Sequence, residues 1–204
     1  MQYIIPEFMK QPLKDLPYVI LDLETTGFSP NEAGITEVAI ISIVNGNEEP
    51  FETLINPERP IPAEITKITG ITEAMVCDKP KISELAAILD GMLNNAIFVS
   101  HNVPFDWAFL DYYFRKHLKK SLCMPSLCTL RLARKYLGLR SNKLSSVADY
   151  FHIDLQNAHR AMNDTRAVRD ILFNFIDLLE KHGIKTGEDL YKHSLVFPEY
   201  PPAR

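Results

Sequence analysis

Four acidic residues and one histidine, carried by three separate segments, are the residues of this chain best suited to chemistry. Two carboxylates share Leu-Asp-Leu-Glu-Thr-Thr-Gly at 21–27, a third ends His-Asn-Val-Pro-Phe-Asp at 101–106, and the fourth ends His-Arg-Ala-Met-Asn-Asp at 159–164. The candidates are Asp22, Glu24, Asp106, Asp164 and His159. Carboxylates brought together repel one another unless divalent cations neutralise them, so the set predicts a metal site. A histidine beside it is a candidate general base, and the combination indicates metal-dependent phosphodiester hydrolysis.

The first two carboxylates belong to one short apolar run. Asp22 and Glu24 are two residues apart in a predicted strand, so their side chains should leave one face while Leu21 and Leu23 enter the other. Two carboxylates side by side at a strand end form a site for a divalent cation. A ligand set made of oxygen favours Mg²⁺ or Mn²⁺ over zinc.

The other candidates each have a structural alternative. Asp106 lies in the first turn of a predicted helix, where the helix dipole favours negative charge whatever the function. Asp164 should face Arg160 at i−4 and could form a surface ion pair with it. On an ideal helix His159 would lie about 140° from Asp164, so the two converge only if His159 sits in the preceding loop or a frayed turn. It is the joint occurrence of the set that favours a functional site.

Short apolar runs and helical patterns alternate along the chain and must position these residues. Strands are expected at 18–23, 35–44, about 51–55 and 96–100, with Asn45-Gly46 as a hairpin signal. Helices are expected at 82–93, from Pro104 onward, near 129–137 and 144–151, and from about 159 to 182. Prolines at 57, 60 and 62 predict an irregular connection. The order predicts an α/β fold with one mixed sheet flanked by helices.

Length and composition suit one globular domain. The chain has 204 residues, 46% apolar and 24% charged, which is enough for one well-buried core. We expect an N-terminal extension at 1–16, the domain at 17–183 and a C-terminal tail at 184–204. The first residues do not resemble a secretory signal, and no run approaches the about 20 apolar residues of a membrane span. Three cysteines without a Cys-x-x-Cys spacing indicate reduced thiols, so we expect a cytoplasmic protein with no membrane partner.

Positive charge is concentrated in one stretch despite a net charge of −4. From Tyr112 to Lys143 there is no Asp or Glu, while Lys and Arg recur throughout. Such a stretch is either a solvated helix face or a surface for a phosphate backbone. The neighbouring carboxylate cluster favours the second interpretation.

With these residues in hand, the chain resembles the DEDDh 3′–5′ exonuclease family, and within it the proofreading (epsilon) subunits of bacterial replicative polymerases and their stand-alone relatives. The resemblance covers about residues 17 to 180 and rests on three motifs in order, at 19–27, 101–110 and 159–164. Ile55-Asn56-Pro57 and Thr69-Gly70-Ile71-Thr72 also fit the family. The sister subfamily with a tyrosine four residues before the last Asp is disfavoured, because Arg160 occupies that place.

The resemblance implies a ribonuclease-H-like fold and two Mg²⁺ or Mn²⁺ ions per site. Asp22, Glu24 and Asp164 would hold one metal, Asp22 would bridge to the second, and Asp106 would act through water. His159 would take a proton from the attacking water. The backbone of Leu23 and Thr25 would hold the 3′-terminal nucleotide. Four side chains would line its pocket, namely those of Phe28, His101, Asn102 and Phe105. Phe105 is equally well explained as a core residue.

Three hypotheses about function follow from this resemblance. The first is an exonuclease that releases mononucleotides from single-stranded or frayed DNA 3′ ends in proofreading or repair, with a DNA polymerase catalytic subunit as its partner. The alternatives are an exonuclease that trims RNA, and a non-catalytic scaffold subunit. Residues 192–197 faintly resemble a sliding-clamp peptide, although Lys192 replaces its glutamine. The competing interpretation is that Leu195 and Phe197 simply pack on the domain.

Overall fold

One mixed sheet of six strands organises the chain in this computed structural model, which describes residues 5–155 and 159–197. The strand order is β3-β2-β1-β4-β5-β6. The pairs β1–β2, β2–β3 and β5–β6 are antiparallel, whereas β1–β4 and β4–β5 are parallel. The bounds are β1 (Tyr18–Thr25), β2 (Ile35–Val44), β3 (Asn47–Leu54), β4 (Ile97–Ser100), β5 (Ser126–Cys128) and β6 (Val196–Phe197). The predicted mixed sheet is confirmed.

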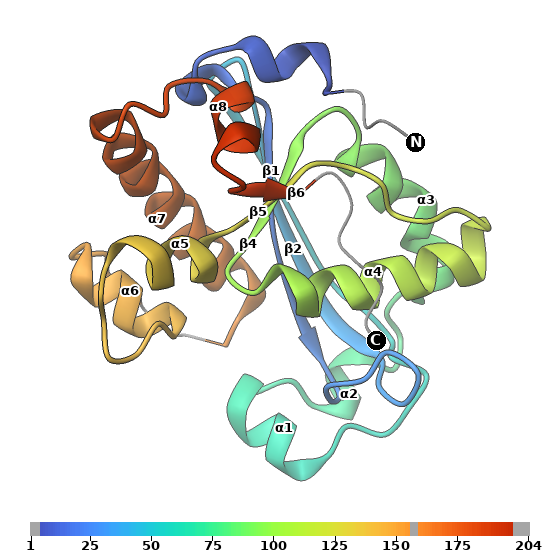
Figure 1. The fold of residues 1–204 in the computed structure, drawn as a ribbon. Coiled ribbons are helices and arrows are strands. Elements are labelled where there is room, and N and C mark those ends of the chain that lie inside the picture. Colours follow the sequence, from blue (N-terminus) through green and yellow to red (C-terminus); the bar gives the residue numbers. More distant parts are fainter. Residues whose placement is uncertain (1–4, 156–158, 198–204) are drawn as a thin grey trace.

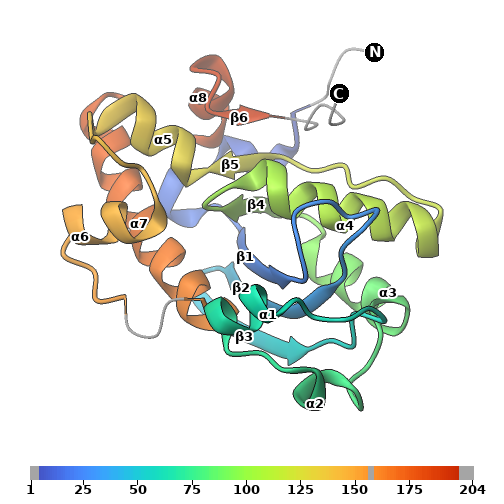
Figure 2. The same cartoon turned by 90° about the horizontal axis from the view of Figure 1, so that it is seen from below.

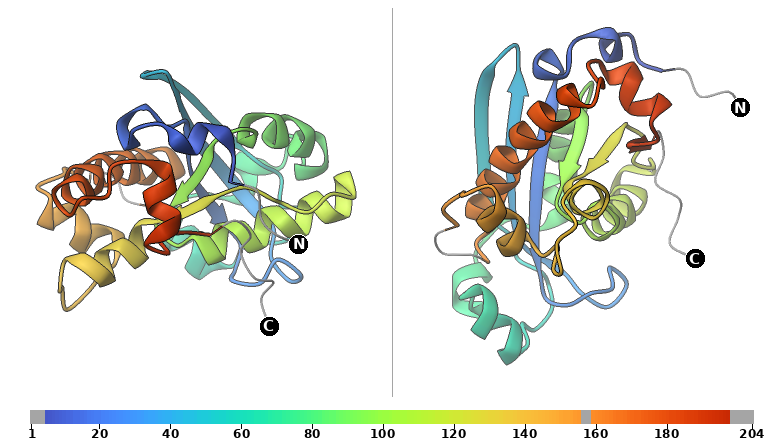
Figure 3. Two further views of the ribbon diagram at one scale, coloured as in Figure 1. Left: turned by 45° about the horizontal axis from the view of Figure 1, so that its top comes forward. Right: turned by 60° about the vertical axis from the view of Figure 1, so that its left-hand side comes forward.

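Helices cover both faces of the sheet (Figure 1). On one face lie α3 (Ile82–Leu93) and α4 (Val103–Leu118); on the other lie α5 (Thr129–Tyr136), α6 (Leu144–Tyr150) and α7 (Ala161–Lys181). Figure 3 shows the long α7 running across the sheet, which agrees with its packing on β1 and β2. The short helices α1 (Ala63–Thr69) and α2 (Glu73–Val76) lie beyond the end of β1, below the sheet in Figure 1. None of the helices in the described residues is long and apolar enough to cross a membrane.

The side chains of β1 alternate between two hydrophobic clusters. Tyr18 and Ile20 belong to the cluster under α7, whereas Leu21 and Leu23 belong to the cluster under α3 and α4. Because successive side chains of a strand point to opposite faces, Asp22 and Glu24 continue the row that faces α7. The predicted separation of the carboxylates from their leucine neighbours is therefore confirmed.

Several elements differ from the sequence expectations. The strand β1 continues to Thr25, and α7 begins at Ala161 instead of about 159. The proline-rich connection contains α1, which begins directly after Pro62, a residue whose fixed φ is compatible with a helix start. Strands β5 and β6 were not expected, because three and two residues are too few to give a periodic pattern.

The segments before β1 and after α7 pack against the rest of the fold. Met9, Leu13 and Leu16 are buried in the cluster under α7, and 3-10 turns cover Glu7–Lys10 and Leu13–Asp15. At the other end, α8 (Gly187–Lys192) leads into β6, which pairs with β5 (Figure 2). Leu195 is buried here, as the packing interpretation of this segment predicted, and so is not available to a clamp in this conformation.

Candidate active site

The carboxyl ends of β1 and β4 bring the first three carboxylates to one edge of the sheet. The two strands run parallel, so Asp22 and Glu24 at the end of β1 lie beside the chain that leaves β4 at Ser100. That chain enters α4, whose first turn carries Asp106. Asp106 is 3% exposed, and its Oδ2 accepts a hydrogen bond of 2.7 Å from the Ser100 hydroxyl. Its carboxylate therefore points into the protein and is more than a helix-start residue at the surface.

The start of α7 supplies the other two candidates. His159 has a φ of 68°, which directs the chain away from the helical path just before Arg160, the N-cap residue. The His159 N–H donates to Asp164 Oδ2 at 3.2 Å. One potential ligand atom from each of Glu24, His159 and Asp164 lies within 4.8 Å of the others. The condition for convergence, that His159 lies ahead of the helix, is met.

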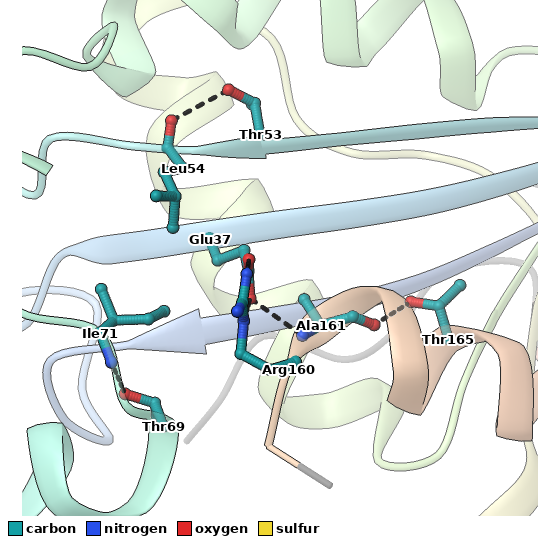
Figure 4. Close-up of polar contacts among 8 residues, drawn as sticks. All are labelled: Glu37, Thr53, Leu54, Thr69, Ile71, Arg160, Ala161 and Thr165. Atoms are coloured by element: carbon teal, nitrogen blue, oxygen red, sulfur yellow. Dashed lines mark hydrogen bonds and ion pairs between the residues drawn. The ribbon is translucent and has the colours of Figure 1, made fainter. Parts of the chain in front are cut away.

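Arg160 does not pair with Asp164, so the surface ion pair that was the structural alternative for Asp164 is not formed. As the N-cap it lies outside the regular helix, and its Nη2 donates to Glu37 Oε1 on β2 at 2.7 Å (Figure 4). The second oxygen of Asp164, Oδ1, is buried and has no hydrogen-bond partner among the described residues. A buried carboxylate oxygen without a partner costs stability unless something else satisfies it, and a cation would.

Burial raises the pKa of every carboxyl group in the cluster, and repulsion between neighbouring acids adds to this effect at Asp22 and Glu24. The pKa of Asp22 lies well above its usual value because the group is desolvated and because Asp106 and Glu24 are close. Desolvation, followed by the charge of Asp164, raises the pKa of Glu24 to about 8. Desolvation also raises the pKa of Asp106 and of Asp164. A divalent cation would relieve this repulsion, so the donor set fits Mg²⁺ or Mn²⁺.

Comparison with known proteins agrees with this geometry. The family model named RNase T, described as exonuclease, matches residues 19–172. The chain belongs to this exonuclease family. It is 35% identical to the DNA polymerase III subunit epsilon of Aquifex aeolicus, with 88% of each chain covered. It is 34% identical to the DNA polymerase III PolC-type of Thermotoga maritima, where 87% of this chain matches only 13% of the longer protein.

Solved structures of exonucleases have the same fold. Exonuclease X in complex with 5′-overhanging duplex DNA superimposes with a TM-score of 0.63 at 27% identity, covering 81% of this chain and 93% of that one. A structure of exonuclease I gives a TM-score of 0.68 at 21% identity, covering 82% and 44%. The fold is accordingly ribonuclease-H-like, and the domain is a 3′–5′ exonuclease domain.

The residues expected to bind the terminal nucleotide lie near the end of β1 and near the start of α4, and they differ in exposure. Leu23 and Thr25 are buried at the end of β1, and the Thr25 hydroxyl donates to the Gly27 carbonyl at 2.6 Å. Phe28 is 88% exposed on the loop that follows. Asn102 is the exposed N-cap of α4, and Phe105 is half-buried against Phe109.

His101 is held by the protein at both ring nitrogens. Nδ1 lies 2.9 Å from the Thr129 hydroxyl, and Nε2 lies 2.9 Å from the Asn142 carbonyl. Burial lowers the pKa of the His101 imidazole. The ring thus fastens the start of α5 and the loop after it to the start of α4, and we expect it to shape the pocket through these contacts.

Two residues near the site were not singled out from the sequence. Ser100 orients Asp106, and Glu37 on β2 binds Arg160 at the start of α7. Ser100 gives no signal in the sequence, because serine is ordinary at a strand end. Glu37 gives one: it is the only charged residue in the run Ile35–Val44.

The metal-free exonuclease should lose stability as the pH rises from 6.5 to 8. Glu24 keeps its proton to about pH 8 when folded but releases it near 4.5 when unfolded, so over this window the folded state holds more protons and a rise in pH disfavours it. Glu24 alone should contribute a loss of about 1–2 kcal/mol, because one proton is worth about 1.4 kcal/mol per pH unit. Below pH 6.5 the lowered pKa of His101 acts in the opposite direction.

Thermal melts in EDTA at both pH values test this expectation. Glu24→Gln is the matched variant and should lose part of the pH dependence, because the raised pKa values of Asp22 and Asp106 act in the same direction. The wild-type protein in saturating Mg²⁺ should lose most of it. The same dependence in wild type and Glu24→Gln would show that another group causes it.

Proposed function

We propose that this exonuclease releases nucleoside monophosphates from the 3′ end of single-stranded or frayed DNA, in proofreading or repair. The observation that carries the proposal is the convergence of Asp22, Glu24, Asp106 and Asp164, with His159, at one edge of the sheet. DNA is favoured because the similar proteins are named as DNA polymerase subunits and because exonuclease X was solved with DNA. The same names support a DNA polymerase catalytic subunit as partner, on a separate chain or on the same one.

The carboxylates are the proposed ligands of two Mg²⁺ or Mn²⁺ ions. Asp22, Glu24 and Asp164 would hold one ion, Asp22 would be shared with the second, and Asp106 would complete the site. Two such ions stabilise the attacking and leaving oxygens of an in-line displacement. The Oδ1 of Asp164, which lacks a partner among the described residues, and the raised pKa of Asp22 and Glu24 support this assignment. A bound cation would satisfy the first and offset the second.

The protein's own groups then bind and orient the substrate. The exposed ring of His159 would remove a proton from the attacking water, a role that needs access from solvent. The backbone at Leu23 and Thr25 would hold the terminal nucleotide. Phe28, exposed on the loop that follows β1, offers a surface on which a base can stack.

Hydrolysis of a 5′-labelled single-stranded DNA oligonucleotide, beside its RNA counterpart, tests the proposal. In Mg²⁺ or Mn²⁺ we expect a ladder that shortens from the 3′ end and disappears in EDTA and in Asp164→Asn. Faster cleavage of RNA than of DNA would assign RNA as the substrate, since the two differ at the 2′-OH. No cleavage of either strand in either metal would favour a non-catalytic scaffold.

Exposed cations beside the site should bind the phosphates of the substrate strand. Arg134, Arg140 and Lys143 are exposed and have no ion-pair partner within the described residues. The loop that carries the last two is bound to His101 through the carbonyl of Asn142, and burial, together with the nearby charge of Arg134, lowers the pKa of His101. These contacts place the three cations on the α5–α6 side of the active site.

Arg140→Gln/Lys143→Gln is therefore expected to weaken the binding of single-stranded DNA and its dependence on salt. Each lost phosphate contact should lower the slope of log affinity against log salt by about 0.7. Fluorescence anisotropy in Ca²⁺ across a salt series measures both quantities. Lys181→Gln/Lys185→Gln removes the same charge near the far end of α7 and is the control. Equal slopes in the two double variants would exclude this surface.

A further inference from the structure

Glu37 is a buried acid that lies beside the metal-ligand candidates without belonging to them. It is 3% exposed, and it stands directly opposite Glu24 in the antiparallel β1–β2 pair. Residues directly opposite each other in such a pair project from the same face of the sheet. A second carboxylate beside Glu24 worsens the repulsion there, so its presence requires a compensating contact.

That compensation comes from the first residues of α7. Glu37 Oε1 accepts from Arg160 Nη2 at 2.7 Å, and Oε2 accepts from Arg160 Nε at 3.3 Å and from the Ala161 N–H at 3.0 Å (Figure 4). The N-cap side chain of α7 makes no capping hydrogen bond of its own. Glu37 therefore satisfies one of the unpaired N–H groups of a helix to which it is not connected in sequence, and a two-point contact with arginine fixes orientation as well as distance.

The turn that Glu37 holds carries both His159 and Asp164. His159 stands immediately before Arg160 in a left-handed conformation, which is uncommon for residues other than glycine although histidine adopts it more readily than most. Its N–H is bound to Asp164, and the Thr165 hydroxyl donates to the Ala161 carbonyl at 2.7 Å. We propose that Glu37 and Arg160 are a positioning pair that sets the first turn of α7 against β1, so that His159 and Asp164 meet Glu24. The proposal rests on the proposed function above.

A competing role for Arg160 makes a different prediction. Its side chain is 45% exposed and could contact a substrate phosphate directly. If Arg160 contacts a phosphate, its substitution should raise KM and leave Mn²⁺ affinity unchanged. Glu37→Gln should then cause only part of that rise in KM. A positioning role lowers Mn²⁺ affinity and kcat, and gives the same result whichever partner is changed.

The experiment compares Glu37→Gln, Arg160→Gln, Arg160→Lys and the Glu37→Gln/Arg160→Gln double variant. Mn²⁺ affinity is measured by electron paramagnetic resonance without DNA, and kcat and KM are measured on single-stranded DNA. Loss of outer-shell partners should weaken Mn²⁺ binding and lower kcat by about 10–100-fold, with KM nearly unchanged. The double variant should be no worse than either single variant, because both break one interaction. Lysine should restore little, since it lacks the planar fork.

Arg166→Gln is the matched control, because Arg166 is exposed on the same helix and lines the same hollow as Arg160. It should bind Mn²⁺ as the wild type does. If Glu37→Gln does not fold, Arg160→Gln and Arg160→Lys decide, since Arg160 is partly exposed. Wild-type Mn²⁺ affinity in folded variants, or a change in KM alone, would overturn the positioning pair while the exonuclease proposal stands. A wild-type protein that neither binds Mn²⁺ nor cleaves DNA would overturn both.

Discussion

Asp22→Asn should abolish hydrolysis and yet stabilise the metal-free protein. Burial is the largest cause of the raised pKa of Asp22. Four acidic neighbours raise it further, in the order Asp106, Glu24, Asp164 and Glu37. A carboxyl group whose pKa is raised on folding costs stability at neutral pH, whether it takes up a proton or stays charged. Asparagine keeps the shape and removes this cost. The same change removes the proposed shared ligand, and we expect activity to fall by at least about 10³-fold, the upper range for losing one electrostatic stabiliser.

Two measurements on one preparation test this pair of effects. The melting temperature in EDTA should rise, by about 2–4 °C for each kcal/mol of relieved repulsion in a chain of this size. Mg²⁺ should then raise the melting temperature of Asp22→Asn less than that of the wild type. Asp15→Asn, an exposed acid before β1, is the control and should change neither quantity. A variant that is both inactive and less stable in EDTA would indicate that Asp22 supports the fold, and not a metal.

Local pattern was sufficient to predict the elements that carry the first carboxylates. The alternation of Asp22 and Glu24 with Leu21 and Leu23 requires only the period of a strand, and β2 and α3 have the predicted bounds because both are long and periodic. Asp106 was placed correctly in the first turn of α4, since Pro104 marks the start of that helix.

Contacts between segments that are distant in the sequence could not be predicted from local sequence patterns. Local spacing offered Asp164, four residues away, as a partner for Arg160, but Arg160 pairs with Glu37, which lies 123 positions earlier. Nothing in a window around residue 160 reveals that partner, and so the helix start was also misplaced by two residues. The hydrogen bonds of His101 to Thr129 and Asn142 depend on the same tertiary arrangement. The five polar residues still predicted one shared site, because their types and their order along the chain indicate common chemistry even when the contacts that hold them together are unknown.

His159→Ala is expected to lower kcat by about 10²–10⁴-fold, the contribution of a general base. The structure gives the residue two conceivable roles, because a ring nitrogen of His159 lies close enough to Glu24 and Asp164 to ligate the same ion. A base is favoured by the exposure of the ring, which leaves it open to water, whereas the two carboxylates are less exposed. Loss of a base leaves the ions in place, so Mn²⁺ affinity should stay at the wild-type value while Asp164→Asn loses it.

Added imidazole separates the two roles further. Because the His159 ring is exposed, its removal leaves a space that solvent reaches, and free imidazole should restore part of the activity of His159→Ala. It should restore none to Asp164→Asn, which lacks a ligand. Mn²⁺ affinity that falls equally in both variants would instead make His159 a ligand. The proton of the attacking water would then need another acceptor, and Asp106, held by Ser100 with a pKa that burial raises, would be the next to test.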